Sequence, residues 1–192
     1  MLAEILIILL LLLANAAFAM SEMAVAASSK ARLKAMSDEG QSGAREALEM
    51  AEDPNHFLSA VQIGITLIAT LTGAFGGTTV ADELALYFEG NPGLSAYSDA
   101  LALAMVVLPL AFLSLIIGEL APKRIALSSP ERIASLSAPF LSAFSRLVSP
   151  AVKLLGFCTN LVLKALGVRP STGPSVTEEE IRILIDQGTS AG

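Results

Sequence analysis

A short stretch around Glu119 carries the residue types best suited to binding a cation. An uncharged run extends from Ala100 to Gly118, and a carboxylate, a proline and two basic residues follow it within six positions. Burying a lone carboxylate at a helix centre in lipid costs roughly 2.5–3.5 kcal/mol, so such groups usually face a protein interior or a wet cavity. Pro122 has no backbone N–H, which leaves the Gly118 carbonyl without a partner in a continuing helix. The pattern predicts a cation site; the alternative is that Glu119 pairs with Lys123 at the membrane surface.

The composition places the chain among membrane proteins. Its 192 residues are 54% hydrophobic and only 16% charged, whereas soluble domains carry about 25% charged residues. The single cysteine, Cys158, and the single histidine, His56, exclude a disulfide framework, a thiolate cluster and a histidine-based metal site. The net charge of −6 disfavours nucleic acid as a partner.

Three segments are predicted to span the bilayer, at about residues 2–28, 57–81 and 100–121. The first contains Ala17-Phe18-Ala19, which resembles a signal-peptide cleavage site. A signal peptide, however, begins with basic residues, and Lys and Arg are missing from the start of this chain. The pattern therefore favours an uncleaved spanning helix over a removed signal.

The first two spans contain polar groups that a helix facing only lipid would not need. Gln62 and Thr66 are four residues apart and share a helical face, and Gly64 permits close helix approach or a break. Ser21 and Glu22 lie near the end of the first span. Ordinary helix packing explains serine, threonine and glycine equally well, and Glu22 has the alternative of an interfacial lysine partner. The Gln62 amide is harder to explain by packing, because it needs partners away from water.

Basic residues predict the orientation. They follow the first and third spans, whereas the connection at residues 82–99 has no Lys or Arg. The positive-inside rule then places the N-terminus outside and the C-terminus in the cytoplasm. This topology brings Ser21, Gln62 and Glu119, from three helices, to the cytoplasmic half of the membrane. Their convergence favours the cation site.

Two further segments are predicted to be helical without spanning. Residues 30–53 indicate a helical hairpin or bent helix, either on the membrane surface or merely solvated. Residues 130–167 are apolar but contain Pro139 and Pro150, which we expect to break them into amphipathic helices in the cytoplasmic interface. The alternative is a fourth span, which would place the C-terminus outside. Residues 171–192 indicate a linker and the first helix of a truncated cytoplasmic domain, opened by a capping box at Thr177.

Three motifs resemble those of one family. They are Phe18-Ala19-Met20-Ser21-Glu22-Met23-Ala24 with the basic residues after it, Gln62-Ile63-Gly64-Ile65-Thr66-Leu67, and Gly118-Glu119-Leu120-Ala121-Pro122-Lys123. The chain resembles the CNNM/CorC magnesium transporters, which share the DUF21 transmembrane domain, over residues 1–170. The helix predicted at Thr177 looks like the entry to the cytoplasmic CBS-domain pair that usually follows and is absent here.

This resemblance implies an all-α membrane protein that forms a homodimer, with three spans per subunit and a juxtamembrane helical belt. It implies a Mg²⁺ site within the first three helices and efflux coupled to Na⁺ entry. Ser21 and Glu119 carry over as metal-site residues. Many members have Asn where this chain has Ile65, so Gln62 and Thr66 are our substitutes on the second helix.

Mg²⁺ takes about six oxygen ligands at about 2.0–2.1 Å, although the same ligands suit Mn²⁺ and Co²⁺. The predicted set combines one carboxylate with neutral oxygens: Ser21, Gln62, Gly64, Thr66, Gly118 and Glu119. We therefore predict a Mg²⁺ exporter of the inner (plasma) membrane. The rivals are a channel, or a non-transporting scaffold or Mg²⁺ sensor that anchors a soluble domain. An enzyme is disfavoured, because the spans hold no Ser/His or paired-Asp arrangement.

Overall fold

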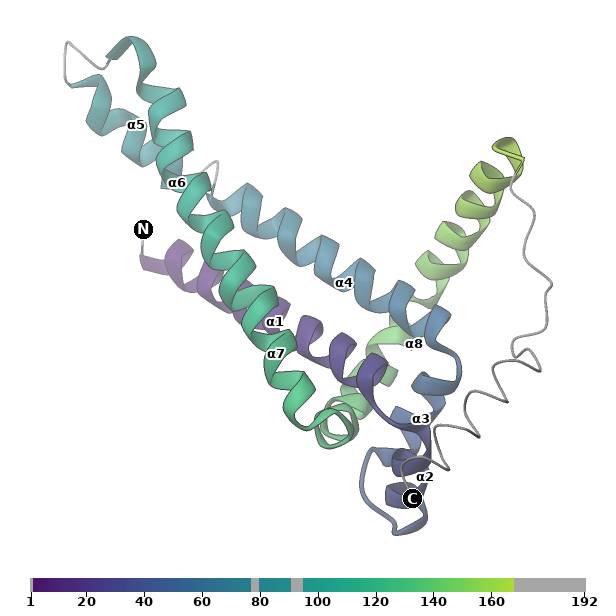
Figure 1. Ribbon diagram of the computed structural model, residues 1–192. Helices are drawn as coiled ribbons and strands as arrows, with labels where there is room; N and C mark the ends of the chain where they lie inside the picture. Colours follow the sequence, from purple (N-terminus) through teal and green to yellow (C-terminus); the bar gives the residue numbers. More distant parts are fainter. Residues whose placement is uncertain (1, 77–79, 91–94, 168–192) are drawn as a thin grey trace, which may run out of the picture. The chain divides into compact units, whose positions relative to one another are not determined.

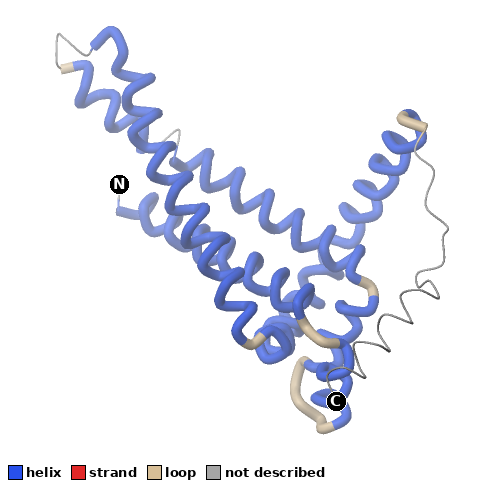
Figure 2. Tube along the Cα trace, viewed as in Figure 1, coloured by secondary structure: helices blue, strands red, loops and turns tan. Residues whose placement is uncertain are grey.

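The computed structural model describes residues 2–76, 80–90 and 95–167 (Figures 1 and 2), and this part of the chain is helical throughout, without strands. The predicted all-α class is confirmed. The helices are α1 (Leu2–Ala27), α2 (Lys30–Asp38), α3 (Ala44–Glu52), α4 (Pro54–Phe75), α5 (Ala81–Glu89), α6 (Ser98–Leu115), α7 (Ala121–Ser128) and α8 (Pro130–Ala165), with a 3₁₀ turn η2 (Ser95–Tyr97) and a π-helical turn η3 (Ile116–Leu120).

Four helical stretches in the described residues are long and apolar enough to cross a membrane: α1, α4, the run from Ser98 to Ser128, and α8. The chain is therefore a membrane protein with several candidate spans. The prediction of three spans and the alternative of a fourth differ only in the role of α8, which length and composition alone leave open.

The first and third predicted spans agree well with the structure. α1 ends at Ala27, one residue before the predicted end at 28. The third span runs without interruption through α6, η3 and α7 to Ser128, seven residues beyond the predicted end at 121. Pro122 lies in the first turn of α7 and does not end the helix.

The second predicted span, 57–81, is shifted from the observed helix. α4 begins at Pro54, at the first helical position after Asp53, and it ends at Phe75, before Gly76. Proline in the first turn is an ordinary helix start, whereas Gly76 keeps a right-handed helical backbone, with φ of −67° and ψ of −44°. The connection predicted at 82–99 contains a helix that the sequence analysis missed, α5, which packs against α6. The Asn91-Pro92-Gly93 sequence of this connection predicts a turn, and it lies outside the described residues.

Residues 30–53 form the predicted helical hairpin, α2 followed by α3, with Gly40 and Gly43 in the turn at φ of 75° each. Both glycines adopt the left-handed backbone conformation that other residues disfavour. Leu33, Ala47 and Ala51 form an apolar stripe on this hairpin, and all three are buried. These side chains belong to the same hydrophobic core as Ala134 and Ala138 of α8, so this stripe packs within the protein.

The prediction that prolines break residues 130–167 is wrong, because α8 is one helix from Pro130 to Ala165 with Pro139 and Pro150 inside it. Pro139 removes the hydrogen bond that the Ser135 carbonyl would accept. That carbonyl lies against Gly43, where a Cβ would overlap with it. The missing side chain of Gly43 thus leaves room for the Ser135 carbonyl of α8.

The chain divides into two compact units, residues 1–153 and 154–192. In the first unit, the core includes Phe18, Val25 and Leu141. The ring of Phe18 makes edge-to-face contacts with Phe140 and Phe144, at centroid distances of 5.9 and 4.9 Å. In the second unit, residues 154–165 are the last turns of α8, and their side chains are exposed. The linker and the helix predicted after residue 170 lie outside the described residues.

Candidate cation site

The π-helical turn η3 is the local feature on which the candidate site is built. The backbone N–H of Ala121 donates to the carbonyl of Ile116, five residues earlier, and the turn Ile116–Leu120 has the sequence Ile-Ile-Gly-Glu-Leu. Single π-turns inside α-helices are rare and occur frequently at functional sites. This turn buries Gly118 and leaves Glu119 half-buried.

Asn15 of α1 contacts this turn directly. Its side-chain Nδ2 donates a hydrogen bond of 3.2 Å to the Gly118 carbonyl, the oxygen that Pro122 was expected to leave without a partner in its own helix. Glycine is required for this approach, because a Cβ at residue 118 would lie 2.9 Å from Asn15 Nδ2.

The other side-chain atom of Asn15, Oδ1, is buried and has no hydrogen-bond partner, and the residue is only 3% exposed. An unsatisfied buried acceptor costs about 1–3 kcal/mol, and a cation or a water molecule would remove that cost. The sequence analysis did not include Asn15 in the site. The available signal was its position as the single amide in the apolar run from Ile5 to Phe18.

Glu119 is not paired with Lys123, which was the alternative interpretation of the motif. Lys123 Nζ instead lies 3.6 Å from Glu22 Oε2 of α1, with side-chain exposures of 39% for the lysine and 24% for the glutamate. Among the described residues, none forms a hydrogen bond or ion pair with the Glu119 carboxylate. The carboxylate is therefore available to a ligand.

Asn15 and Glu22 lie on one face of α1, because residues seven apart are two helical turns apart. Both contact the third span, Asn15 at Gly118 and Glu22 at Lys123. The two contacts bracket Glu119 along the sequence. One face of α1 thus meets η3 and α7 through polar groups.

Ser21 lies on the same helix and is buried. It is 4% exposed, and its hydroxyl donates to the Ala17 carbonyl at 2.7 Å. No described hydrogen bond joins Ser21 to Glu119, so its role as a ligand stays a prediction.

The residues predicted on α4 divide between two faces. Gly64 is buried, and a Cβ there would lie 2.9 Å from Cε1 of Phe18 and 3.2 Å from Cζ of Phe144. Gln62 and Thr66 are exposed, and Gln62 Nε2 donates to Thr66 Oγ1 at 3.4 Å. They stand two positions before and after Gly64, on the side of α4 away from α1. The structure does not bring them to Glu119, and their role as ligands stays a prediction.

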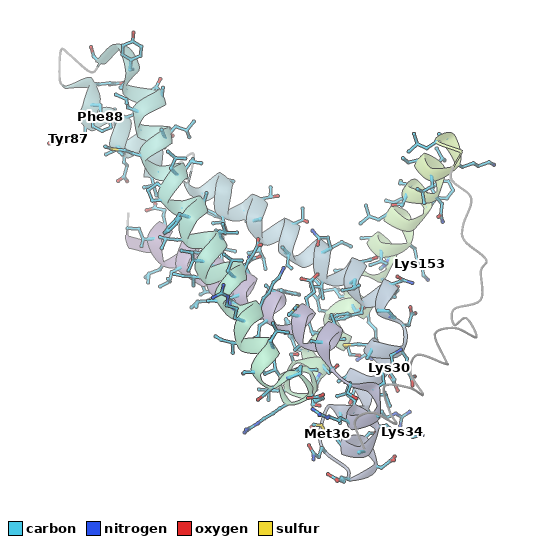
Figure 3. All side chains as sticks on the ribbon, in the orientation of Figure 1. Lys30, Lys34, Met36, Tyr87, Phe88 and Lys153 are labelled. Carbon is cyan, nitrogen blue, oxygen red and sulfur yellow. The ribbon has the colours of Figure 1, made fainter. Side chains whose placement is uncertain are left out.

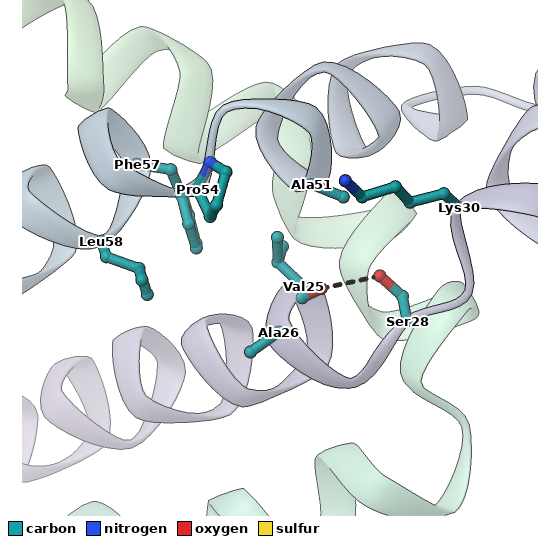
Figure 4. A pocket seen from close by; sticks show the side chains of 8 residues that line it. All are labelled: Val25, Ala26, Ser28, Lys30, Ala51, Pro54, Phe57 and Leu58. Atoms are coloured by element: carbon teal, nitrogen blue, oxygen red, sulfur yellow. Dashed lines mark hydrogen bonds between the residues drawn. The ribbon is translucent and has the colours of Figure 1, made fainter. Parts of the chain in front are cut away.

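No group of three or more His, Cys, Asp or Glu residues able to hold a metal occurs in the part of the chain that the structure describes. The candidate site therefore depends on one carboxylate and on neutral oxygens. A separate cavity of about 290 Å³ lies where α1 ends and α4 begins (Figure 4). It is mostly apolar, and its charged lining residue is Lys30, which makes it unsuitable for a cation; the lining is Val25, Ala26, Ser28, Lys30, Ala51, Pro54, Phe57 and Leu58.

The helices and the polar contacts define a multi-pass helical membrane protein in which the Asn15 amide of α1 bonds to the Gly118 carbonyl in a π-helical turn of the third span, the turn that also carries Glu119. The chain matches the family described as the cyclin M transmembrane N-terminal domain (CNNM) over residues 6–192. It belongs to that family, which confirms the resemblance drawn from the three motifs.

Relatives match nearly the whole chain. The UPF0053 protein sll0260 of Synechocystis sp. is 46% identical over 189 residues, which cover 98% of this chain and 42% of that protein. The uncharacterized protein Rv1841c of Mycobacterium tuberculosis is 32% identical over 193 residues, which cover 100% of this chain and 55% of that protein. The polyamine export protein of Escherichia coli is 28% identical over 192 residues, which cover 100% and 43%. The chain thus spans about half the length of these relatives.

Proposed function

We propose that this domain carries Mg²⁺ across the membrane as an exporter coupled to Na⁺ entry, with the cation bound at the π-helical turn. The observation that carries the proposal is the Glu119 carboxylate, half-buried and without a described partner, in the same turn as the Gly118 carbonyl. The unsatisfied Oδ1 of Asn15 supplies a neutral oxygen beside that carbonyl.

The donor set suits a cation that must be both bound and released. Mg²⁺ accepts carboxylate, carbonyl and amide oxygens and commonly keeps several waters. One carboxylate compensates half of its charge, so the neutral oxygens hold it without trapping it. Ser21, Gln62, Gly64 and Thr66 remain predicted ligands. In the described arrangement no hydrogen bond or ion pair joins them to Glu119, and we expect a movement of α1 or α4 to bring them to it.

The proposed topology places the N-terminus outside the cell and α2 in the cytoplasm, with α8 in the interface and two copies forming a homodimer of the inner membrane. Figure 3 shows Lys30 and Lys34 of α2 at one end of the helices and Tyr87 and Phe88 of α5 at the other. Basic residues mark the cytoplasmic side and aromatic residues mark an interface.

Maleimide labelling of single cysteines in intact cells tests this topology. Tyr87→Cys and Lys34→Cys would each be made in a chain carrying Cys158→Ala. We expect an impermeant maleimide to label the Tyr87→Cys chain at once, and the Lys34→Cys chain only after the membrane is opened. The reverse pattern would overturn the orientation.

A second substrate class has a specific observation in its favour, since one relative is named a polyamine export protein. A single carboxylate among neutral oxygens binds an ammonium group as well as a metal ion. The scaffold and the Mg²⁺ sensor are further rivals, because both retain the fold without transport.

Flux into liposomes separates these functions. We expect the purified chain to carry Mg²⁺ into the liposomes, where an internal dye reports it. This flux should be faster when a Na⁺ gradient drives Na⁺ out of the liposomes, in the opposite direction. Glu119→Gln should reduce the flux to that of empty liposomes, whereas Glu52→Gln, an exposed acid of α3, should not. Flux of labelled spermidine without Mg²⁺ flux would favour polyamine export. Mg²⁺ binding without flux would indicate a sensor, and neither binding nor flux a scaffold.

A further inference from the structure

Lys123 has two candidate carboxylate partners, Glu119 on its own helical run and Glu22 on α1. The structure pairs it with Glu22, which is farther away in the sequence. Glu119 precedes it by four residues, the spacing and order in which a glutamate and a lysine on one helix attract each other. The observed partner is Glu22 of α1, with Nζ and Oε2 3.6 Å apart.

The pairing has a direct consequence for Glu119. An ammonium group carries three donors and no acceptor, so Lys123 paired with Glu119 would occupy oxygens that a metal ion needs. A competitor tethered one helical turn away acts at an effective concentration of at least the millimolar range. A free Lys123 would therefore compete with cations arriving from solution.

We propose that Glu22 is a positioning residue that holds Lys123 away from Glu119 and so keeps the Glu119 carboxylate available to a divalent cation. The inference rests on the proposed function and adds a regulatory contact to the same site. Glu22 itself need not touch the cation. Its carboxylate acts through the lysine, and the ion pair also fixes α1 against α7.

Substitutions at the three residues separate this role from a structural one. Mg²⁺ binding to the purified full chain is measured by calorimetry, with Mg²⁺ alone as the probe. Glu22→Gln releases the lysine and should weaken binding about tenfold. Lys123→Met removes the competitor and should bind as tightly as wild type or tighter. The double variant Glu22→Gln/Lys123→Met should recover to within about twofold of wild type.

Arg124 provides the matched control for the rescue, since it is the neighbouring cation on α7, is exposed, and pairs with no described residue. Glu22→Gln/Arg124→Met should stay as weak as Glu22→Gln alone. A merely structural role for Glu22 predicts the opposite pattern, in which Lys123→Met breaks the same ion pair and weakens binding as much as Glu22→Gln does.

The outcomes distinguish this inference from the function on which it rests. If wild type binds Mg²⁺ and Glu119→Gln does not, the site stands. Unchanged binding in Glu22→Gln, or failure of Lys123→Met to restore it, then overturns the role of Glu22 alone. If wild type binds no Mg²⁺, or Glu119→Gln binds like wild type, the proposed site and this inference both fall.

Discussion

The two sides of α1 differ in the chemistry by which they contact their neighbours. Toward the third span, α1 presents Asn15 and Glu22, which bond to a carbonyl and a lysine. Toward α4, it presents Phe18, whose ring fills the space left by Gly64. In lipid, helices associate through close packing and polar contacts, because the tails are as apolar as the side chains. The apolar side holds α1 to α4, while the polar side places a half-satisfied site next to a carboxylate.

Phe18→Ala should have the largest effect on stability. The side chain is 7% exposed and packs against two further rings, and emptying such a site costs about 3 kcal/mol. We expect a marked fall in the thermal unfolding temperature in detergent. Phe112→Ala, which removes a ring that is 63% exposed, is the control and should cost little. Equal losses would mean that the α1–α4 contact has no special weight.

Asn15→Leu should damage the polar side selectively. It removes one interhelical hydrogen bond, which in membranes contributes about 0.6–1.7 kcal/mol, and it also removes the orphaned Oδ1. We expect a modest drop in unfolding temperature but a Mg²⁺ affinity at least about tenfold lower, equivalent to 1.4 kcal/mol. Ser28→Ala removes a bond of 2.8 Å from the residue after α1 to the Val25 carbonyl and should leave affinity intact. Normal affinity in Asn15→Leu would remove that residue from the site.

Gly64→Ala should destabilise the apolar side despite alanine's better helix propensity. The new methyl group meets the Phe18 ring at 2.9 Å, and overpacking costs about 1–3 kcal/mol against a gain of about 1 kcal/mol from propensity. A methyl group at residue 73 would have no heavy atom within 4 Å, so Gly73→Ala should stabilise the protein. Thermal unfolding in detergent should show a lower midpoint for Gly64→Ala and a higher midpoint for Gly73→Ala than for wild type. Two shifts in the same direction would contradict this prediction.

Gln62→Leu should have the smallest effect. The side chain is exposed and bonds only to Thr66, so we expect a stability change below about 0.5 kcal/mol and a Mg²⁺ affinity within about threefold of wild type. A loss as large as that of Asn15→Leu would mean that α4 moves its polar face toward Glu119 when the cation binds.

Much of the fold followed from the sequence because lipid imposes a simple rule. Only helices satisfy their own backbone in a bilayer, so long apolar runs such as 2–28 are predictable to within a residue. The prolines of α8 misled the prediction because proline's local preference is to end a helix. The space left by Gly43, which is distant in the chain, could not be inferred from the sequence near Pro139.

The site was predictable where the relevant partners are neighbours in the chain and unpredictable where they are not. Sequence alone predicted a carboxylate at the end of an apolar run, Glu119, and a Gly118 carbonyl that loses its helical partner to Pro122, because both follow from the local sequence. Only the tertiary structure decided which partners these groups have: Asn15 takes the carbonyl and Glu22 takes Lys123. Those choices depend on how α1 is rotated against η3 and α7, which packing sets across about a hundred residues of intervening chain.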